Sequence, residues 1–169
     1  MSNETEMKDN VREDVYDKEL FDRLLDQNDI DEFRKEFLEL HNYEQSEYFE
    51  DTDDGNRQKI FEFLSPKEVA NFFDQLDFDD DDYESLFDNM DATYASHVLE
   101  EMSYDNAVDI LNELSKPKVA SLLTLMNKDK ANEIKALLHY EEDTAGGIMT
   151  TEFISLKSTT PVKEALIHV

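Results

Sequence analysis

The sequence predicts an all-α fold, an α-solenoid of about ten short helices, with a change of structure near the C-terminal end. Apolar residues recur at helical spacing almost throughout the chain. The 169 residues include only 3 Gly and 3 Pro, which favours regular elements over loops. Equivalent apolar positions also recur at Leu64, Met90, Leu114 and Leu138, in steps of 26, 24 and 24 residues. That period suits two short helices and two turns, the repeat unit typical of an α-solenoid.

The apolar stripes place the expected helices in order along the chain. Each stripe is one helix face, with apolar residues three or four positions apart. Each expected helix has about ten residues and is too short to be stable alone, so the fold depends on stacking of neighbours. The stripes occupy residues 20–25, 30–40, 60–64, 69–76, 90–102, 107–114, 119–126 and 131–138.

Polar residues that favour helix starts stand between these stripes. Ser65 precedes Pro66, a combination typical of an N-cap followed by the first helical residue. Further candidate N-caps with the same chemistry stand at Asp91, Ser103, Ser115 and Asn127. The stripes and the caps therefore predict the same boundaries.

The helical pattern breaks at Ala145-Gly146-Gly147. Residues 153–156 are typical of a short strand, and residues 162–166 begin an amphipathic helix. One strand and part of a helix cannot bury a core, so we expect the chain to end inside a second domain. The expected organisation is a partly disordered acidic extension over residues 1–18, a helical domain over 19–145, and a junction with an incomplete domain over 146–169.

The excess of negative charge argues against two classes of binding partner, nucleic acids and anionic membranes. The chain has 43 Asp and Glu against 16 Lys and Arg, a net charge of −27. Such a chain lacks the excess of basic residues with which proteins bind nucleic acid or an anionic membrane surface. It has no Cys, which excludes disulfides and thiolate metal sites. No apolar run approaches the roughly 20 residues that a membrane-spanning helix needs.

Residues 68–115, called the base-free window below, contain 15 Asp and Glu and neither Lys nor Arg. This concentration of like charge has two interpretations that the sequence leaves open. The window is either a solvated face that aids solubility or a surface that binds a divalent cation. Carboxylates without Cys or clustered His suit hard ions such as Mg²⁺ or Ca²⁺.

Asp105 and Asp109 are the candidate cation ligands within this window. They stand four residues apart on an expected helix, so both carboxylates project from one face. Asp105 also falls in the first turn, where the helix dipole favours an anion. An EF-hand at residues 51–62 is excluded, because Gly55 does not occupy the loop position that the motif requires.

Catalytic chemistry has no matching pattern in the sequence. The four histidines, His41, His97, His139 and His168, are scattered, and no catalytic triad order, phosphate-binding loop or HExxH motif is present. We therefore expect a protein that is not an enzyme.

Residues 140–153, YEEDTAGGIMTTEF, strongly resemble a junction in MgtE-type magnesium transporters. In that family a helical N-terminal domain joins the first CBS domain at this motif. The upstream helices resemble the family's N domain, which implies a right-handed superhelix similar to armadillo-like and flagellar motor switch domains. Residues 149–169 resemble the opening of a CBS domain, which implies a truncated α/β fragment after the helices.

The resemblance implies a function. The family forms homodimeric Mg²⁺ channels whose N domains lie on the cytosolic side of the cell membrane. Mg²⁺ bound between the N domain, the CBS domains and the pore neutralises acidic surfaces and favours pore closure. The family's metal-contacting positions correspond here to Asp105, Asp109, the backbone carbonyl of Gly147 and Asn71, where the family often has an acid. The expected partners are the protein's own CBS and transmembrane domains. The alternative is an α-solenoid adaptor that binds other proteins and does not respond to metal.

Overall fold

A computed structural model of the chain describes residues 16–76 and 80–138. These residues form ten α-helices and no strand, which confirms the all-α prediction for this part of the chain. None of these helices is both long and apolar enough to span a membrane. The helices are α1 (Lys18–Asp26), α2 (Ile30–Glu39), α3 (Asn42–Glu50), α4 (Asp54–Phe63), α5 (Pro66–Phe73), α6 (Asp80–Asp88), α7 (Ala92–Glu101), α8 (Tyr104–Glu113), α9 (Lys116–Leu125) and α10 (Lys128–Leu137).

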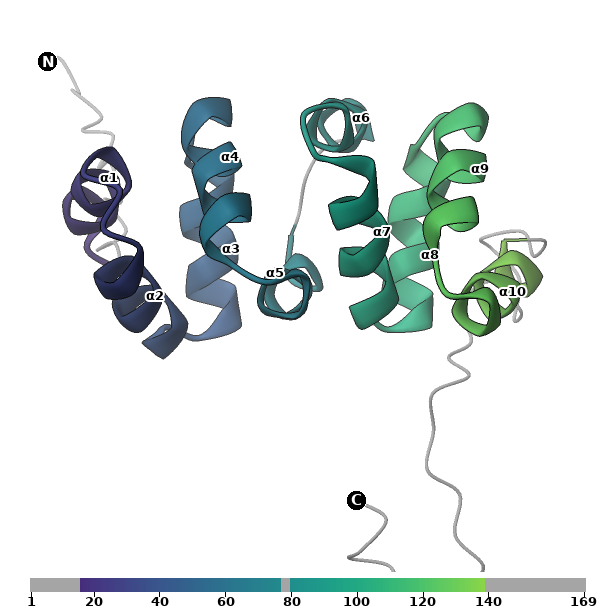
Figure 1. Ribbon diagram of the computed structural model, residues 1–169, viewed down its shortest axis with the longest axis horizontal. Helices are drawn as coiled ribbons and strands as arrows, with labels where there is room; N and C mark the ends of the chain where they lie inside the picture. The colour runs from purple at the N-terminus through teal and green to yellow at the C-terminus, as the bar shows by residue number, and fades with distance from the viewer. Residues whose placement is uncertain (1–15, 77–79, 139–169) are drawn as a thin grey trace, which may run out of the picture.

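The helices follow one another along an elongated array, from α1 and α2 at one end to α10 at the other (Figure 1). Alternate helices pack on each other: α3 on α5, α5 on α7 and α7 on α9 form one series. A second series runs from α6 to α8 and from α8 to α10. This is the packing expected when helix pairs stack as repeats, since each helix contacts its equivalent in the next unit.

Three of the four repeating apolar positions have a common structural role, whereas the fourth, Leu138, is the partly buried C-cap residue of α10. Leu64, Met90 and Leu114 are all buried, with exposed fractions of 3%, 7% and 6%. Each immediately precedes the N-cap of a helix, namely α5, α7 and α9. An apolar residue at this position fixes the angle at which the chain enters the next helix. The repeat period is therefore the spacing between successive anchored helix starts.

All five predicted N-caps are N-caps in the structure. The side chains of Ser65, Asp91 and Asn127 accept hydrogen bonds from backbone N–H groups of the turn that follows. Ser103 and Ser115 occupy the N-cap position without such a bond. Local sequence therefore determines where these helices begin.

The core changes in composition along the array. Its N-terminal half is aromatic, and Phe37 alone packs against four rings with centroids 5.0 to 5.9 Å away. The C-terminal half is aliphatic, with fully buried residues such as Val98, Leu99, Leu111 and Ile134. In both halves the buried residues come from successive helices and form one continuous core.

None of the apolar stripes predicted from the sequence corresponds to helix α3 or helix α6. The buried face of α3 includes the polar residues Gln45 and Ser46, which masks its helical pattern. Gln45 is satisfied there because its amide donates to the carbonyls of Phe37 and Leu40. The α6 helix begins inside the aspartate run and carries few apolar residues.

Two stripes were wrong at particular positions. In the stripe at residues 119–126, Leu125 was expected on the buried face but is 43% exposed. Ile30 and Leu38, expected on the buried face of the second stripe, are 44% and 37% exposed. Ile30 is the first residue of α2, and Phe33 and Phe37 supply the face that packs.

Several predictions from the sequence lie outside the described residues. They are the terminal extension before residue 16, the junction motif with Gly147, and the strand and helix expected after residue 152. The domain boundaries at 18–19 and 145–146 stay predictions.

Candidate functional site

The candidate cation ligands lie at the start of α8. Ser103 is the N-cap, Asp105 lies in the first turn, and Asp109 follows one turn later. The predicted placement of both carboxylates on one helix is confirmed. Asp109 is exposed, whereas Asp105 is only partly exposed.

Two oxygen atoms at this helix start have no hydrogen-bond partner within the described part of the chain. They are Asp105 Oδ1 and Ser103 Oγ, and both are shielded from solvent. Buried polar atoms are usually satisfied, so such an oxygen would be stabilised by a proton donor or a cation. Because Oδ1 is shielded, a cation from solvent would reach this carboxylate through its other oxygen. Mg²⁺ needs few protein carboxylates and keeps several waters, so Asp105 offers one carboxylate oxygen of the kind that this ion binds.

Asp109 lines a small cavity of about 110 Å³ where α8 meets α6 and the end of α5. Asp74, the C-cap residue of α5, and Asn106 of α8 line the same cavity. The cavity thus joins two carboxylates and an amide, all of which offer oxygen atoms to hard cations. No local pattern of residues indicated Asp74, because its position beside the same cavity as Asp109 depends on how α5, α6 and α8 pack.

Asn71 lies on α5 and is exposed, but it is not among the described residues that line this cavity. Within residues 16–76 and 80–138, no group of three or more His, Asp or Glu side chains is close enough to hold a metal ion. The structure therefore places Asp105 and Asp109 together on α8 and does not complete the coordination of a cation there.

A lysine from α10 lies at the same helix start. Lys130 Nζ is 3.6 Å from the centroid of the Tyr104 ring and donates to the carbonyl of Met102 at 2.7 Å. Tyr104 is the first residue of α8, directly before Asp105. This positive charge reduces the local negative potential that a cation would meet at Asp105.

The base-free window is partly neutralised by residues from outside it, which its sequence did not indicate. Arg34 of α2 binds Glu68 through two hydrogen bonds of 2.6 and 2.9 Å. Lys118 of α9 contacts Glu84 at 3.2 Å and Asp88 at 2.6 Å. At least three of the 15 acids are therefore in ion pairs, and the negative charge is concentrated on the others.

Glu68 is the most strongly held of these acids. Its carboxylate also accepts hydrogen bonds from Ser65 N–H and Oγ, both at 2.8 Å. Burial of Glu68 raises its pKa, but the hydrogen bonds from Arg34 and Ser65 outweigh that effect. The net result is a pKa below the ordinary value for glutamate.

Glu84 caps a helix other than its own. It accepts hydrogen bonds from the N–H and Oγ of Ser115, the N-cap of α9, both at 2.9 Å. These bonds explain why the Ser115 side chain does not cap its own helix. The bond from Ser115 N–H, followed by the bonds from Ser115 Oγ and Lys118, outweighs partial desolvation and lowers the pKa of Glu84.

Comparisons with known proteins agree on one family. Residues 40–143 match the family described as the MgtE intracellular N domain. The chain is 46% identical over 137 residues to the magnesium transporter MgtE of Enterococcus faecalis (strain ATCC 700802 / V583). This match covers 81% of the chain and 30% of the relative, so the chain spans less than a third of that protein's length.

Two solved structures have the same architecture. The crystal structure of the soluble part of a magnesium transporter superposes with a TM-score of 0.85 at 42% identity, covering 89% of this chain and 59% of that one. The cytosolic domain of the Mg²⁺ channel MgtE in complex with ATP superposes with a TM-score of 0.75, covering 89% and 61%. At 22% identity, the second match supports the fold alone. The family match covers well over half of the chain, and the chain therefore belongs to the MgtE intracellular N domain family.

Proposed function

We propose that this chain is the Mg²⁺-sensing regulatory domain of a homodimeric magnesium transporter, on the cytosolic side of the cell membrane. The observation that supports the proposal most is the match of residues 40–143 to the MgtE intracellular N domain. The role proposed is regulatory and not enzymatic. The relative with 46% identity is a magnesium transporter, and the chain spans only 30% of its length. The pore would therefore lie in other parts of the protein.

The proposed architecture adds a superhelical twist to the stacked helices and includes segments outside the described residues. The stacked helices would wind as a right-handed superhelix over residues 19–145, after an acidic extension over 1–18. Residues 146–169 would form the junction and the first strand and helix of a CBS domain. Dimerisation would use parts of the protein beyond this chain.

The proposed mechanism is electrostatic. Asp105 and Asp109 would bind Mg²⁺ together with oxygen ligands from the CBS region, the Gly147 carbonyl and Asn71. Mg²⁺ would supply positive charge between acidic surfaces that otherwise repel one another. Binding would hold the N domain against the CBS domains and favour the closed pore. When Mg²⁺ falls, repulsion among the acids that lack a basic partner would separate the domains.

Small-angle scattering during a Mg²⁺ titration tests this proposal. The protein should be extended to the length of the soluble magnesium-transporter part that it matches, so that the partner surface is present. The radius of gyration should fall as Mg²⁺ rises, at constant ionic strength. Asp105→Asn combined with Asp109→Asn should abolish the fall.

The matched control is Asp129→Asn combined with Glu133→Gln. These acids have the same spacing on α10, and Asp129 likewise lies in the first turn. The control should compact like the unmodified protein. No compaction in the unmodified protein would contradict the proposal and favour the adaptor alternative, which predicts no response to Mg²⁺.

A further inference from the structure

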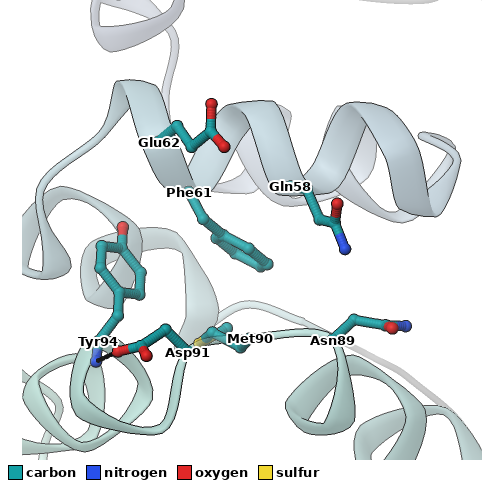
Figure 2. A pocket seen from close by; sticks show the side chains of 7 residues that line it. All are labelled: Gln58, Phe61, Glu62, Asn89, Met90, Asp91 and Tyr94. Atoms are coloured by element: carbon teal, nitrogen blue, oxygen red, sulfur yellow. Dashed lines mark hydrogen bonds between the residues drawn. The ribbon is translucent and has the colours of Figure 1, made fainter.

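A second pocket lies between α4 and the start of α7, separate from the cavity at Asp109. Its volume is about 250 Å³, and Phe61, Met90 and Tyr94 supply its apolar surface. Figure 2 shows Phe61 pointing from α4 into the space that Tyr94 faces from α7. Pockets for small molecules usually measure about 300–1,000 Å³, so this one suits a single side chain better.

The apolar walls of this pocket are held in place. The Tyr94 hydroxyl donates to the Leu64 carbonyl at 2.8 Å, which ties α7 to the end of α4. The Phe61 ring packs against Tyr94 and also against Phe49 and Phe73. A wall fixed in this way loses little conformational entropy when a partner binds.

Two carboxylates border the pocket, Glu62 from α4 and Asp91 from the start of α7. Both side chains are exposed. Asp91 accepts hydrogen bonds from the N–H groups of Thr93 and Tyr94 as the N-cap of α7. Neither carboxylate has an ion-pair partner among the residues that the structure describes.

Two basic residues of α4, Arg57 and Lys59, are engaged away from Glu62. Arg57 of α4 donates to the carbonyls of Phe49 and Glu50 at 3.1 and 2.7 Å. Lys59 lies 3.5 Å from Asp26 of α1. The described residues that line the pocket include no Lys or Arg. The pocket therefore combines aromatic walls with a net negative rim.

We propose that this pocket binds the arginine side chain of a partner protein. A guanidinium can lie flat against an aromatic ring while it donates hydrogen bonds to carboxylates. Its apolar stem suits the surface formed by Met90 and Phe61. The side-chain amides of Gln58 and Asn89, which also line the pocket, can bind the partner's backbone. Arginine is also among the residues that most often anchor protein interfaces. This inference does not depend on Mg²⁺ sensing.

Nuclear magnetic resonance of the ¹⁵N-labelled chain tests the proposal with three short blocked peptides. They are acetyl-Gly-Arg-Gly-amide, the same peptide with neutral citrulline, and the same peptide with leucine. Citrulline matches arginine in shape and lacks its charge. At physiological ionic strength, the arginine peptide should give saturable shifts of amides in residues 58–62 and 89–94, with a dissociation constant of roughly 1 mM. The citrulline and leucine peptides should bind at least about tenfold more weakly.

Charge-removing variants locate the binding site. Glu62→Gln and Asp91→Asn should each weaken arginine-peptide binding about fivefold, since each removes one ion pair. Asparagine remains a good N-cap, so Asp91→Asn should leave α7 intact. The matched control is Asp29→Asn, which alters the N-cap of α2 in the same way and lies outside the pocket. Its affinity should stay within twofold of the unmodified chain, and each amide spectrum also reports whether the variant folds.

Three results would overturn the proposal. The first is equal affinity for the arginine and citrulline peptides. The second is a set of shifts spread over the acidic surface without concentration at residues 58–62 and 89–94, which would indicate unspecific attraction between charges. The third is unchanged affinity in Glu62→Gln and Asp91→Asn while both variants remain folded.

Discussion

Removing the ion pair between Arg34 and Glu68 would show how much one acid of the base-free window contributes to the free energy of unfolding. Arg34 Nη1 and Nη2 reach the two carboxylate oxygens at 2.9 and 2.6 Å, and Nη1 also donates to the Phe63 carbonyl at 2.7 Å. The side chains are 35% and 22% exposed. We predict that Arg34→Ala and Glu68→Ala each destabilise the chain, and that the double variant loses less than their sum.

The expected coupling between these residues follows from geometry and exposure. Fully exposed ion pairs contribute about 0.2–1 kcal/mol, and hydrogen bonds to charged groups about 1.5–3 kcal/mol. A two-bond pair of intermediate exposure should therefore have a coupling energy of about 1.5 kcal/mol. Each single substitution should cost about 2–3 kcal/mol. Arg34→Ala also removes the donor to Phe63, and Glu68→Ala also removes the capping box with Ser65.

A double-mutant cycle in urea, followed by helical circular dichroism, measures the coupling. The control cycle uses Lys35 and Glu36, whose charged atoms are 2.7 Å apart but whose side chains are 58% and 33% exposed. Its coupling should be clearly smaller than that of Arg34 and Glu68, because solvent screens an exposed pair. Equal coupling in the two cycles would refute the reasoning, because it would mean that the bidentate geometry and partial burial at Glu68 add nothing.

Three further predictions concern stability. Phe37→Ala should cost about 3–5 kcal/mol in urea unfolding, because the residue is fully buried against four aromatic rings, and a smaller loss would mean that the core refills. Tyr94→Phe should lower the free energy of unfolding by about 1 kcal/mol, because it removes the hydrogen bond to the Leu64 carbonyl. The control, Tyr43→Phe, should change thermal stability little, because Tyr43 is 55% exposed. The pKa of Glu68 in the fold lies below its ordinary value of 4.5, so its ion pair stabilises the fold above that pH and is lost as pH falls through the lower folded-state pKa. Glu68→Gln should therefore flatten the loss of stability in acid, and an unchanged acid profile would count against this assignment.

Local chemistry predicted the helix starts well. N-cap residues act within one turn, so Ser65, Asp91 and Asn127 could be identified without knowledge of the fold. The recurrence of an apolar residue every 24 to 26 positions predicted the stacking, because Leu64, Met90 and Leu114 each precede the N-cap of an alternate helix. Helix α3 was missed because Gln45 and Ser46 are buried through hydrogen bonds, which a search for apolar periodicity does not detect.

Only those parts of the candidate site that lie within one helix could be predicted from the sequence. Asp105 and Asp109 are one turn apart on a single helix, so spacing alone places them together. The approach of Asp74 to the same cavity depends on the packing of three helices. Tertiary packing also brings Lys118 to Glu84 and Lys130 to the start of α8. A stretch of sequence that contains no Lys or Arg can therefore still have lysine and arginine side chains beside it in the folded protein.

The central claim is that Mg²⁺ binds at Asp105 and Asp109 in preference to other acids of the chain. A Mg²⁺ titration at constant ionic strength tests it most directly, with the ¹⁵N-labelled protein extended to the length of the soluble magnesium-transporter part that it matches. The structure supplies an internal comparison, because Asp129 and Glu133 have the same spacing at the start of α10. We expect larger, saturable amide shifts at residues 103–109 than at 127–133, and their loss in Asp105→Asn with Asp109→Asn. Equal shifts in the two helices, or none at α8, would contradict it.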